Sequence, residues 1–234
     1  MNSTPNNARD RLIIALDFPD ADRALSAARD LADDVRFFKI GLQLYTAAGP
    51  EIVRAVRATG ADVFLDLKLH DIPNTVAKAV EAAATLDVAM LTIHLSGGRR
   101  MIEAAVASAP TGLLLLGVTV LTSSDQATLQ ETGVTSSVES QTVRLAELGA
   151  AAGIPGLVAS PHELGALRNA VGDRVKIITP GVRPTWAAAD DQKRFTTPRQ
   201  AIDNGADYLV IGRPVTAHQS PREAVRQIIS EIGG

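Results

Sequence analysis

Asp66, Lys68 and Asp71 place three charges of alternating sign in one short, otherwise apolar segment. Successive residues of a β-strand point to opposite faces, so Asp66 and Lys68 share one face of the strand predicted here. The opposite face is apolar and consists of Val63, Leu65, Leu67 and Leu69. Burying such charges is costly unless they are paired or hydrogen-bonded. The pattern therefore predicts either a structural ion-pair network or an active site in which Lys68, held as a cation by carboxylates, is a general acid.

Strand-like and helix-like segments alternate along the chain. Eight apolar segments are predicted to be strands: Leu12–Asp17, Val35–Gly41, Asp62–Leu69, Val88–His94, Leu113–Leu121, Gly156–Ser160, Val175–Thr179 and Tyr208–Gly212. The predicted helices are Ala21–Leu31, Thr75–Thr85, Arg99–Ser108, Ser140–Ala152, His162–Val171 and Arg222–Ile232. This alternation over 234 residues is typical of an α/β protein with one (β/α)8 TIM barrel domain, residues 1–234. Residues 1–11 are predicted to be a polar N-terminal tail of this domain. A doubly wound open sheet is the alternative, but it does not usually need eight similar repeats.

Composition excludes several classes of function. The net charge of −3 gives no sign of a nucleic-acid or anionic-membrane partner, and the absence of cysteine excludes disulfides and thiolate metal sites. The longest apolar run, Leu113–Leu121, is far shorter than the ~20 residues of a membrane span. The polar N-terminus lacks the apolar stretch of a signal peptide. We therefore expect a soluble, cytoplasmic protein.

Further polar residues end other predicted strands. Asp17 ends the first strand, and Lys39 lies near the end of the second. Active sites of such barrels lie at the carboxyl ends of the strands, so these side chains are expected to meet Asp66 and Lys68 at one mouth. Charges that alternate in sign compensate one another and stay ionised when water is excluded.

A phosphate site is predicted at the last two strands. Gly212 and Arg213 follow the eighth strand, where barrels frequently bind phosphate on backbone N–H groups. Arginine binds phosphate oxygens bidentately, and glycine lets the backbone approach closely. The preceding long segment, Pro180–Thr197, carries more basic residues, and the other long segment is Thr122–Val138. Segments of this length in a compact domain are usually binding loops or lids.

Taken together, these motifs resemble those of the orotidine 5′-phosphate decarboxylase family, in its short, single-function bacterial form. The central motif is Asp66-x-Lys68-x-x-Asp71-Ile72-Pro73-Asn74-Thr75. Other matching segments follow in family order: Leu12–Asp17, Phe38–Gly41, Thr92–His94, Thr179–Pro184 and Val210–Pro214. The resemblance implies a barrel enzyme that converts orotidine 5′-monophosphate to UMP and CO₂ in pyrimidine biosynthesis, without a metal or cofactor.

The resemblance also implies a role for each charged residue. Lys68 is the proton donor to C6 of the pyrimidine. Asp66 and Asp71 lie beside the substrate carboxylate, and Lys39 completes the charged array. Asp17 and Lys39 contact the ribose hydroxyls, and Asp66 also counts among the substrate contacts.

Binding residues and a partner are implied as well. Asp71 and Thr75 reach the active site of the neighbouring subunit, which implies a homodimer with shared sites. Residues implied to bind substrate are Thr122 at the pyrimidine edge and Arg183, Gln192, Gly212 and Arg213 at the phosphate.

Two alternatives remain open at this point. The same spacing is similar to that of 3-keto-hexulose-phosphate synthases and related metal-dependent decarboxylases, which use a carboxylate on the second strand as a Mg²⁺ ligand. Lys39 stands there in this chain and opposes metal binding. A non-catalytic nucleotide-binding barrel would be expected to have lost Lys68. The sequence assigns no role to His94 or Trp186.

Overall fold

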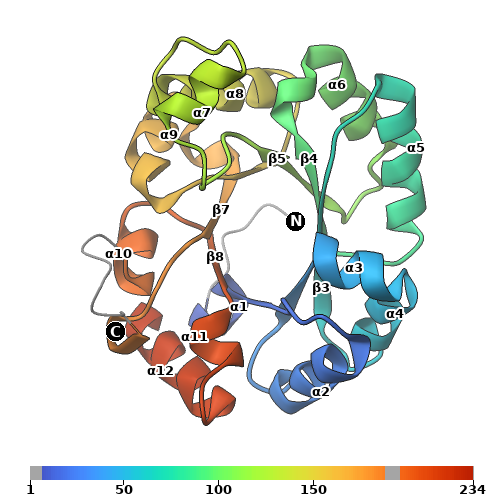
Figure 1. Cartoon of the computed structure of the whole chain (residues 1–234), viewed down its shortest axis with the longest axis vertical. Helices are drawn as coiled ribbons and strands as arrows, with labels where there is room; N and C mark the ends of the chain where they lie inside the picture. The colour runs from blue at the N-terminus through green and yellow to red at the C-terminus, as the bar shows by residue number, and fades with distance from the viewer. Residues whose placement is uncertain (1–6, 188–195, 234) are drawn as a thin grey trace.

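The computed structural model describes residues 7–187 and 196–233. Within these residues, eight parallel strands close into a barrel in which each strand pairs with the next and β8 pairs with β1 (Figure 1). The strands are β1 Leu12–Ala15, β2 Phe37–Gly41, β3 Asp62–Leu69, β4 Met90–His94, β5 Leu114–Val118, β6 Gly156–Val158, β7 Lys176–Pro180 and β8 Tyr208–Ile211. The predicted (β/α)8 TIM barrel is therefore confirmed.

Helices surround the barrel (Figure 1). The α-helices are α1 Ala8–Arg11, α2 Ala21–Leu31, α3 Leu42–Ala48, α4 Glu51–Arg57, α5 Pro73–Ala84, α6 Arg99–Ser108, α7 Gln126–Glu131, α8 Val138–Ala151, α9 Leu164–Val171, α10 Pro198–Asp203, α11 Arg213–Thr216 and α12 Pro221–Gly233. Short 3₁₀ turns are η1 Leu95–Gly97, η2 Pro161–Glu163, η3 Gly172–Arg174 and η4 Thr185–Ala187.

Local sequence explains where several helices begin. Pro73 occupies the first turn of α5, where its missing N–H has no intrahelical partner to lose. The side chains of Asp20 and Ser137 accept hydrogen bonds from backbone N–H groups in the first turns of α2 and α8. α10 begins with a capping box in which Thr197 and Gln200 each accept the other's backbone N–H.

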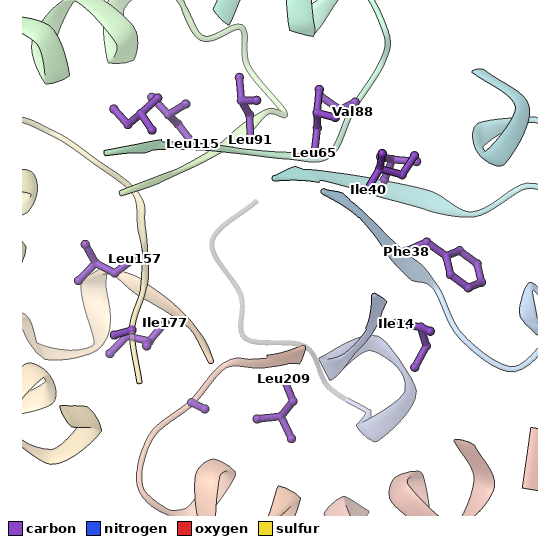
Figure 2. Packing of buried hydrophobic residues seen from close by; sticks show 14 of the residues in the cluster. Ile14, Phe38, Ile40, Leu65, Val88, Leu91, Leu115, Leu157, Ile177 and Leu209 are labelled. Atoms are coloured by element: carbon purple, nitrogen blue, oxygen red, sulfur yellow. The ribbon is translucent and has the colours of Figure 1, made fainter. Parts of the chain in front are cut away.

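Two apolar layers follow from the alternation along each strand. One set of side chains packs between the strands and the helices and includes Ile14, Phe38, Leu65, Leu91, Leu157, Ile177 and Leu209 (Figure 2). The alternate positions fill the inside of the barrel with Ile13, Ala15, Phe37, Phe64, Met90, Leu116, Ile178 and Val210. A fully buried side chain of this size contributes roughly 1.5–3 kcal/mol to folding. The barrel is therefore a packed core below its mouth, not a channel.

β3 differs from the regular strand predicted for it. Leu65 pairs with Leu91 and Leu69 pairs with Ile93, so three residues of β3 lie opposite the single residue Thr92 of β4. Lys68 lies within this bulge and has a positive φ of 52°. Bulges of this kind re-aim side chains and are common next to active sites.

No helix in the described part of the chain is long and apolar enough to cross a membrane.

Candidate active site

The mouth of the barrel is charged because the inward-facing positions change character towards the carboxyl ends of the strands. On β1 the inward position after Ala15 is Asp17, which lies two residues beyond the end of the strand. On β2 and β3 the positions after Phe37 and Phe64 are Lys39 and Asp66. Parallel pairing aligns these strand ends, so the three side chains are brought to one place.

These side chains form a continuous line of alternating charge. Lys39 Nζ lies 2.9 Å from Asp17 Oδ1 and 4.0 Å from Asp66 Oδ2. Lys68 Nζ donates to both oxygens of Asp66, at 2.8 Å each. The side chains of Lys39 and Asp66 are only 12% and 13% exposed, whereas that of Lys68 is 28% exposed. Ionic pairing compensates the partly buried charges, and the Lys68 ammonium remains accessible from the cavity.

A side chain of β4 supports this arrangement. The Thr92 hydroxyl accepts a hydrogen bond from Lys68 N–H at 2.8 Å and donates one to Asp66 Oδ1 at 3.0 Å. Thr92 is fully buried. This contact was not predicted from the sequence. The available signal was the alternation along β4, which places Thr92 on the same inward face as Met90.

The segments after β7 and β8 bring further cationic side chains to the mouth. Arg183 follows β7, and Arg213 follows β8 directly after Gly212. Among the described residues, neither arginine takes part in an ion pair. Trp186 of η4 packs edge-on against His218, with ring centroids 5.2 Å apart, and this contact joins the segment after β7 to the segment after α11.

One cavity of about 780 Å³ unites these features. A cavity of that size accommodates a small organic ligand. Its lining includes eight of the residues predicted from sequence: Asp17, Lys39, Asp66, Lys68, Thr122, Arg183, Gly212 and Arg213.

Three predicted site residues stand apart from that lining. Asp71 and Thr75 are exposed. Asp71 Oδ1 accepts a hydrogen bond from Ile72 N–H at 2.6 Å, beyond the end of β3. Gln192 lies outside the described residues. A single chain therefore does not bring Asp71 to Lys68.

His94 ends β4 beside the charged line. Burial is the largest cause that lowers the pKa of His94, followed by repulsion from His70 and from Lys68. The two imidazole rings lie 5.6 Å apart. A neutral imidazole adds no further cation next to Lys68.

The described residues contain no group of three or more His, Asp or Glu side chains placed to hold a metal ion. At the position on β2 where a ligand would be needed, the Lys39 ammonium lies between two carboxylates. Divalent cations prefer oxygen ligands, so this donor set does not fit one.

Known proteins share both the sequence and the fold. The family model described as orotidine 5′-phosphate decarboxylase / HUMPS family matches residues 10–228. An orotidine 5′-phosphate decarboxylase of Opitutus terrae is 52% identical over 225 residues, which cover 94% of this chain and 97% of that protein. The enzyme of the same name from Nitrosospira multiformis is 46% identical and covers 95% of this chain and 93% of its own.

A solved structure agrees with these sequence matches. The crystal structure of orotidine 5′-phosphate decarboxylase from Lactobacillus acidophilus has a TM-score of 0.85 and 33% identity, and covers 96% of this chain and all of its own. The resemblance drawn from the sequence motifs is confirmed, as is the expectation of an enzyme of this kind. The chain belongs to the orotidine 5′-phosphate decarboxylase / HUMPS family.

Proposed function

We propose that this chain converts orotidine 5′-monophosphate to UMP and CO₂ without a metal or cofactor, and that Lys68 delivers the proton to C6. The observation that carries the proposal is the charged line from Asp17 through Lys39 and Asp66 to Lys68. Its cavity also holds two arginines that make no ion pair within the described part of the chain. The relatives named as decarboxylases of this nucleotide support the choice of substrate.

The chemistry explains why such a line is useful. When the bond between C6 and the carboxylate breaks, its electron pair stays on C6 in the plane of the ring, where no adjacent π-system delocalises it. A fixed ammonium group stabilises this developing charge and then gives up a proton to it. CO₂ leaves, and solvent returns the proton to Lys68. Asp66 holds that ammonium through two hydrogen bonds of 2.8 Å.

Asp66 has a second effect in this proposal. Its carboxylate lies beside the departing carboxylate of the substrate, where two like charges repel one another. Repulsion that is relieved as CO₂ departs favours the transition state over the bound substrate. The Lys39 ammonium, 4.0 Å from Asp66, offsets part of this repulsion while the substrate is bound.

The remaining binding roles follow the walls of the cavity. Asp17 and Lys39 are proposed to contact the ribose, Thr122 the pyrimidine edge, and Gly212 with Arg213 and Arg183 the phosphate. Arginines without an ionic partner among the described residues are suited to a dianion. Gln192 is kept as a proposed phosphate contact from outside the described residues.

We further propose a homodimer with shared sites, to which Asp71 and Thr75 contribute from the partner chain. Both residues are exposed and absent from the cavity of their own chain. Ile72 and Leu42, which follow the ends of neighbouring strands, are 66% and 54% exposed. Apolar side chains beside unused polar groups are typical of a surface that another chain covers. The predicted cytoplasmic location stays a prediction.

The metal-dependent alternative receives no support from this site. The Lys39 ammonium occupies the space between two carboxylates where a cation would have to bind. A metal-dependent relative would be expected to carry a carboxylate there instead.

The test is an ultraviolet assay that follows loss of orotidine 5′-monophosphate by the purified chain, with and without EDTA. We expect equal turnover in both conditions and formation of UMP. No turnover in either condition would contradict the proposed reaction, and turnover lost in EDTA and restored by Mg²⁺ would contradict the metal-independent mechanism. Lys68→Ala is the control for a contaminating enzyme, since loss of a general acid costs roughly 10²-fold or more.

A further inference from the structure

The Thr92 hydroxyl is the point at which β4 holds the two central charged residues of β3. It accepts the backbone N–H of Lys68 at 2.8 Å and donates to Asp66 Oδ1 at 3.0 Å. The same Asp66 oxygen receives one of the hydrogen bonds from Lys68 Nζ. One buried hydroxyl therefore binds the main chain of the lysine and the carboxylate that orients its side chain.

The backbone of Lys68 needs such support. Its φ of 52° lies in the left-handed region, which residues other than glycine and asparagine rarely adopt. Among the described residues, Asp87 is the one other non-glycine residue with a positive φ. Because three residues of β3 lie opposite Thr92 alone, the regular ladder provides no partner for Lys68 N–H. The Thr92 side chain replaces that missing partner.

The Thr92 hydroxyl is donor and acceptor at once. A threonine hydroxyl has one hydrogen to donate, which goes to Asp66, and its lone pairs accept the N–H of Lys68. Valine has nearly the same shape but satisfies neither group, and serine satisfies both. The two substitutions therefore separate the role of the hydroxyl from that of the side-chain volume.

We infer that Thr92 is a positioning residue, which fixes the left-handed backbone of Lys68 and the carboxylate of Asp66 so that the lysine ammonium points into the cavity. This inference rests on the proposed decarboxylation. It adds a residue on β4 that does not itself line the cavity and carries no charge, but that holds two residues of the lining.

The first test compares Thr92→Val with Thr92→Ser by steady-state kinetics. In Thr92→Val, both Lys68 and Asp66 lose a hydrogen bond, and displacement of a reacting group by about 1 Å lowers kcat on the order of 10- to 100-fold. KM is expected to change by less than about threefold, because the proposed phosphate contacts lie in the segments that follow β7 and β8. Thr92→Ser is expected to stay within about threefold of the unsubstituted enzyme in kcat, because both hydrogen bonds remain.

Thr119→Val is the matched control. Thr119 is also buried, its hydroxyl donates to the Val158 carbonyl at 3.1 Å, and its side chain does not line the cavity. Both valine variants are expected to lower Tm, because each loses a buried hydrogen bond, but Thr119→Val is expected to leave kcat unchanged. If Thr119→Val lowered kcat as strongly, or if Thr92→Ser were as slow as Thr92→Val, the positioning role would be wrong.

A structural measurement keeps this inference separate from the proposed reaction. Crystal structures of the unsubstituted chain and of Thr92→Val report φ of Lys68 and the distance from Lys68 Nζ to Asp66, whatever the substrate is. We expect the valine variant to lose the positive φ or the 2.8 Å contacts. An unchanged Lys68 in the Thr92→Val crystal would overturn the inference. A displaced Lys68 in that crystal would support it even if the unsubstituted chain had no decarboxylase activity, a result that would refute only the proposed reaction.

Discussion

Arg213 provides a test at the scale of one residue. It lines the cavity from the start of α11, directly after β8. Lys68 lies on β3, which is not a neighbour of β8 in the barrel. We expect Arg213→Ala to reduce kcat/KM for the full nucleotide by about a hundredfold, since one charge-assisted phosphate contact is worth on the order of 3 kcal/mol. The slow reaction of orotidine, which has no phosphate, is expected to be unchanged. Steady-state assays of both substrates measure the two effects.

Arg213→Lys refines this test. Lysine retains the charge but lacks the planar fork that binds two phosphate oxygens, so an intermediate loss is expected. Equal slowing of both substrates by Arg213→Ala would place Arg213 in the chemistry or the fold, and would contradict the phosphate assignment.

The charged residues of the site were predictable because their signal is local. Alternation along a strand places Asp66 and Lys68 on one face, and the carboxyl ends of parallel strands converge. The partner of Lys68 N–H was not predictable in this way. It depends on the bulge that places three residues of β3 opposite Thr92. The sequence of β3 alone does not indicate this irregular pairing with β4.

At the scale of an element, the end of β2 is adapted to the side chain of Lys39. A Cβ at Gly41 would lie 2.9 Å from Lys39 Nζ and 3.8 Å from Asp17 Oδ1. Gly41→Ala is expected to displace the ammonium group from Asp17 and to lower kcat/KM by about tenfold, since the array must be held closely. Tm is expected to change little, because φ of Gly41 is −96° and the displaced atom is the end of a flexible side chain.

Gly165→Ala is the control for a substitution of the same size. Gly165 lies in α9, and no atom is within 4 Å of the position of its added Cβ. Alanine is the better helix former, so this variant should be fully active and slightly more stable. Full activity in Gly41→Ala as well would show that the position of Lys39 is not critical.

The turn before α9 is expected to give stability a pH dependence. Glu163 accepts the Ser160 N–H at 3.1 Å in a capping box, and burial raises the pKa of Glu163 above its ordinary value of 4.5. The folded state therefore binds this proton more tightly than the unfolded state. The contribution is fully present below pH 4.5 and is lost as pH rises through the pKa of the folded state.

Glu163→Gln separates the charge from the cap. Glutamine also accepts the Ser160 N–H but does not titrate, so the variant is expected to gain stability relative to the unsubstituted chain between about pH 4 and pH 7. Urea unfolding across this range measures the difference. Glu163→Ala loses the acceptor for Ser160 N–H at every pH and should cost on the order of 1 kcal/mol. Parallel pH curves for the glutamine variant and the unsubstituted chain would contradict the assignment.

Elements with strong periodicity were predicted well. The bounds of α2 and α6 agree with the prediction, because apolar residues at helical spacing mark them clearly. The short helices α3, α4 and α7 were missed, since six or seven residues span barely two turns and show little periodicity. α7 lies in the segment predicted as a long loop, where the Asp125 cap on Thr128 N–H was the available signal.

At the scale of the whole molecule, the cavity of one chain lacks an acid that the family motif contains. Asp71 belongs to the same short motif as Lys68, yet it is exposed and accepts a hydrogen bond from the N–H of Ile72. In the homodimer proposed above, Asp71 of each chain would lie near the cavity of the other, because a two-fold interface is the same for both chains. The exposed Ile72 and Leu42 provide apolar area for such a contact.

Mixing two inactive variants tests this shared site. In a hybrid dimer of Lys68→Ala and Asp71→Ala, one site has both defects and the other has neither, so an equal, fully exchanged mixture should recover about a quarter of the unsubstituted activity. The double variant Lys68→Ala, Asp71→Ala, mixed with the unsubstituted chain, is the inverse control. Each of its hybrid dimers has one defect in every site, so exchange should reduce activity from about half to about a quarter. If native mass spectrometry confirms hybrid dimers and the inactive pair recovers nothing, each chain builds its own site, and Asp71 and Thr75 do not serve the partner.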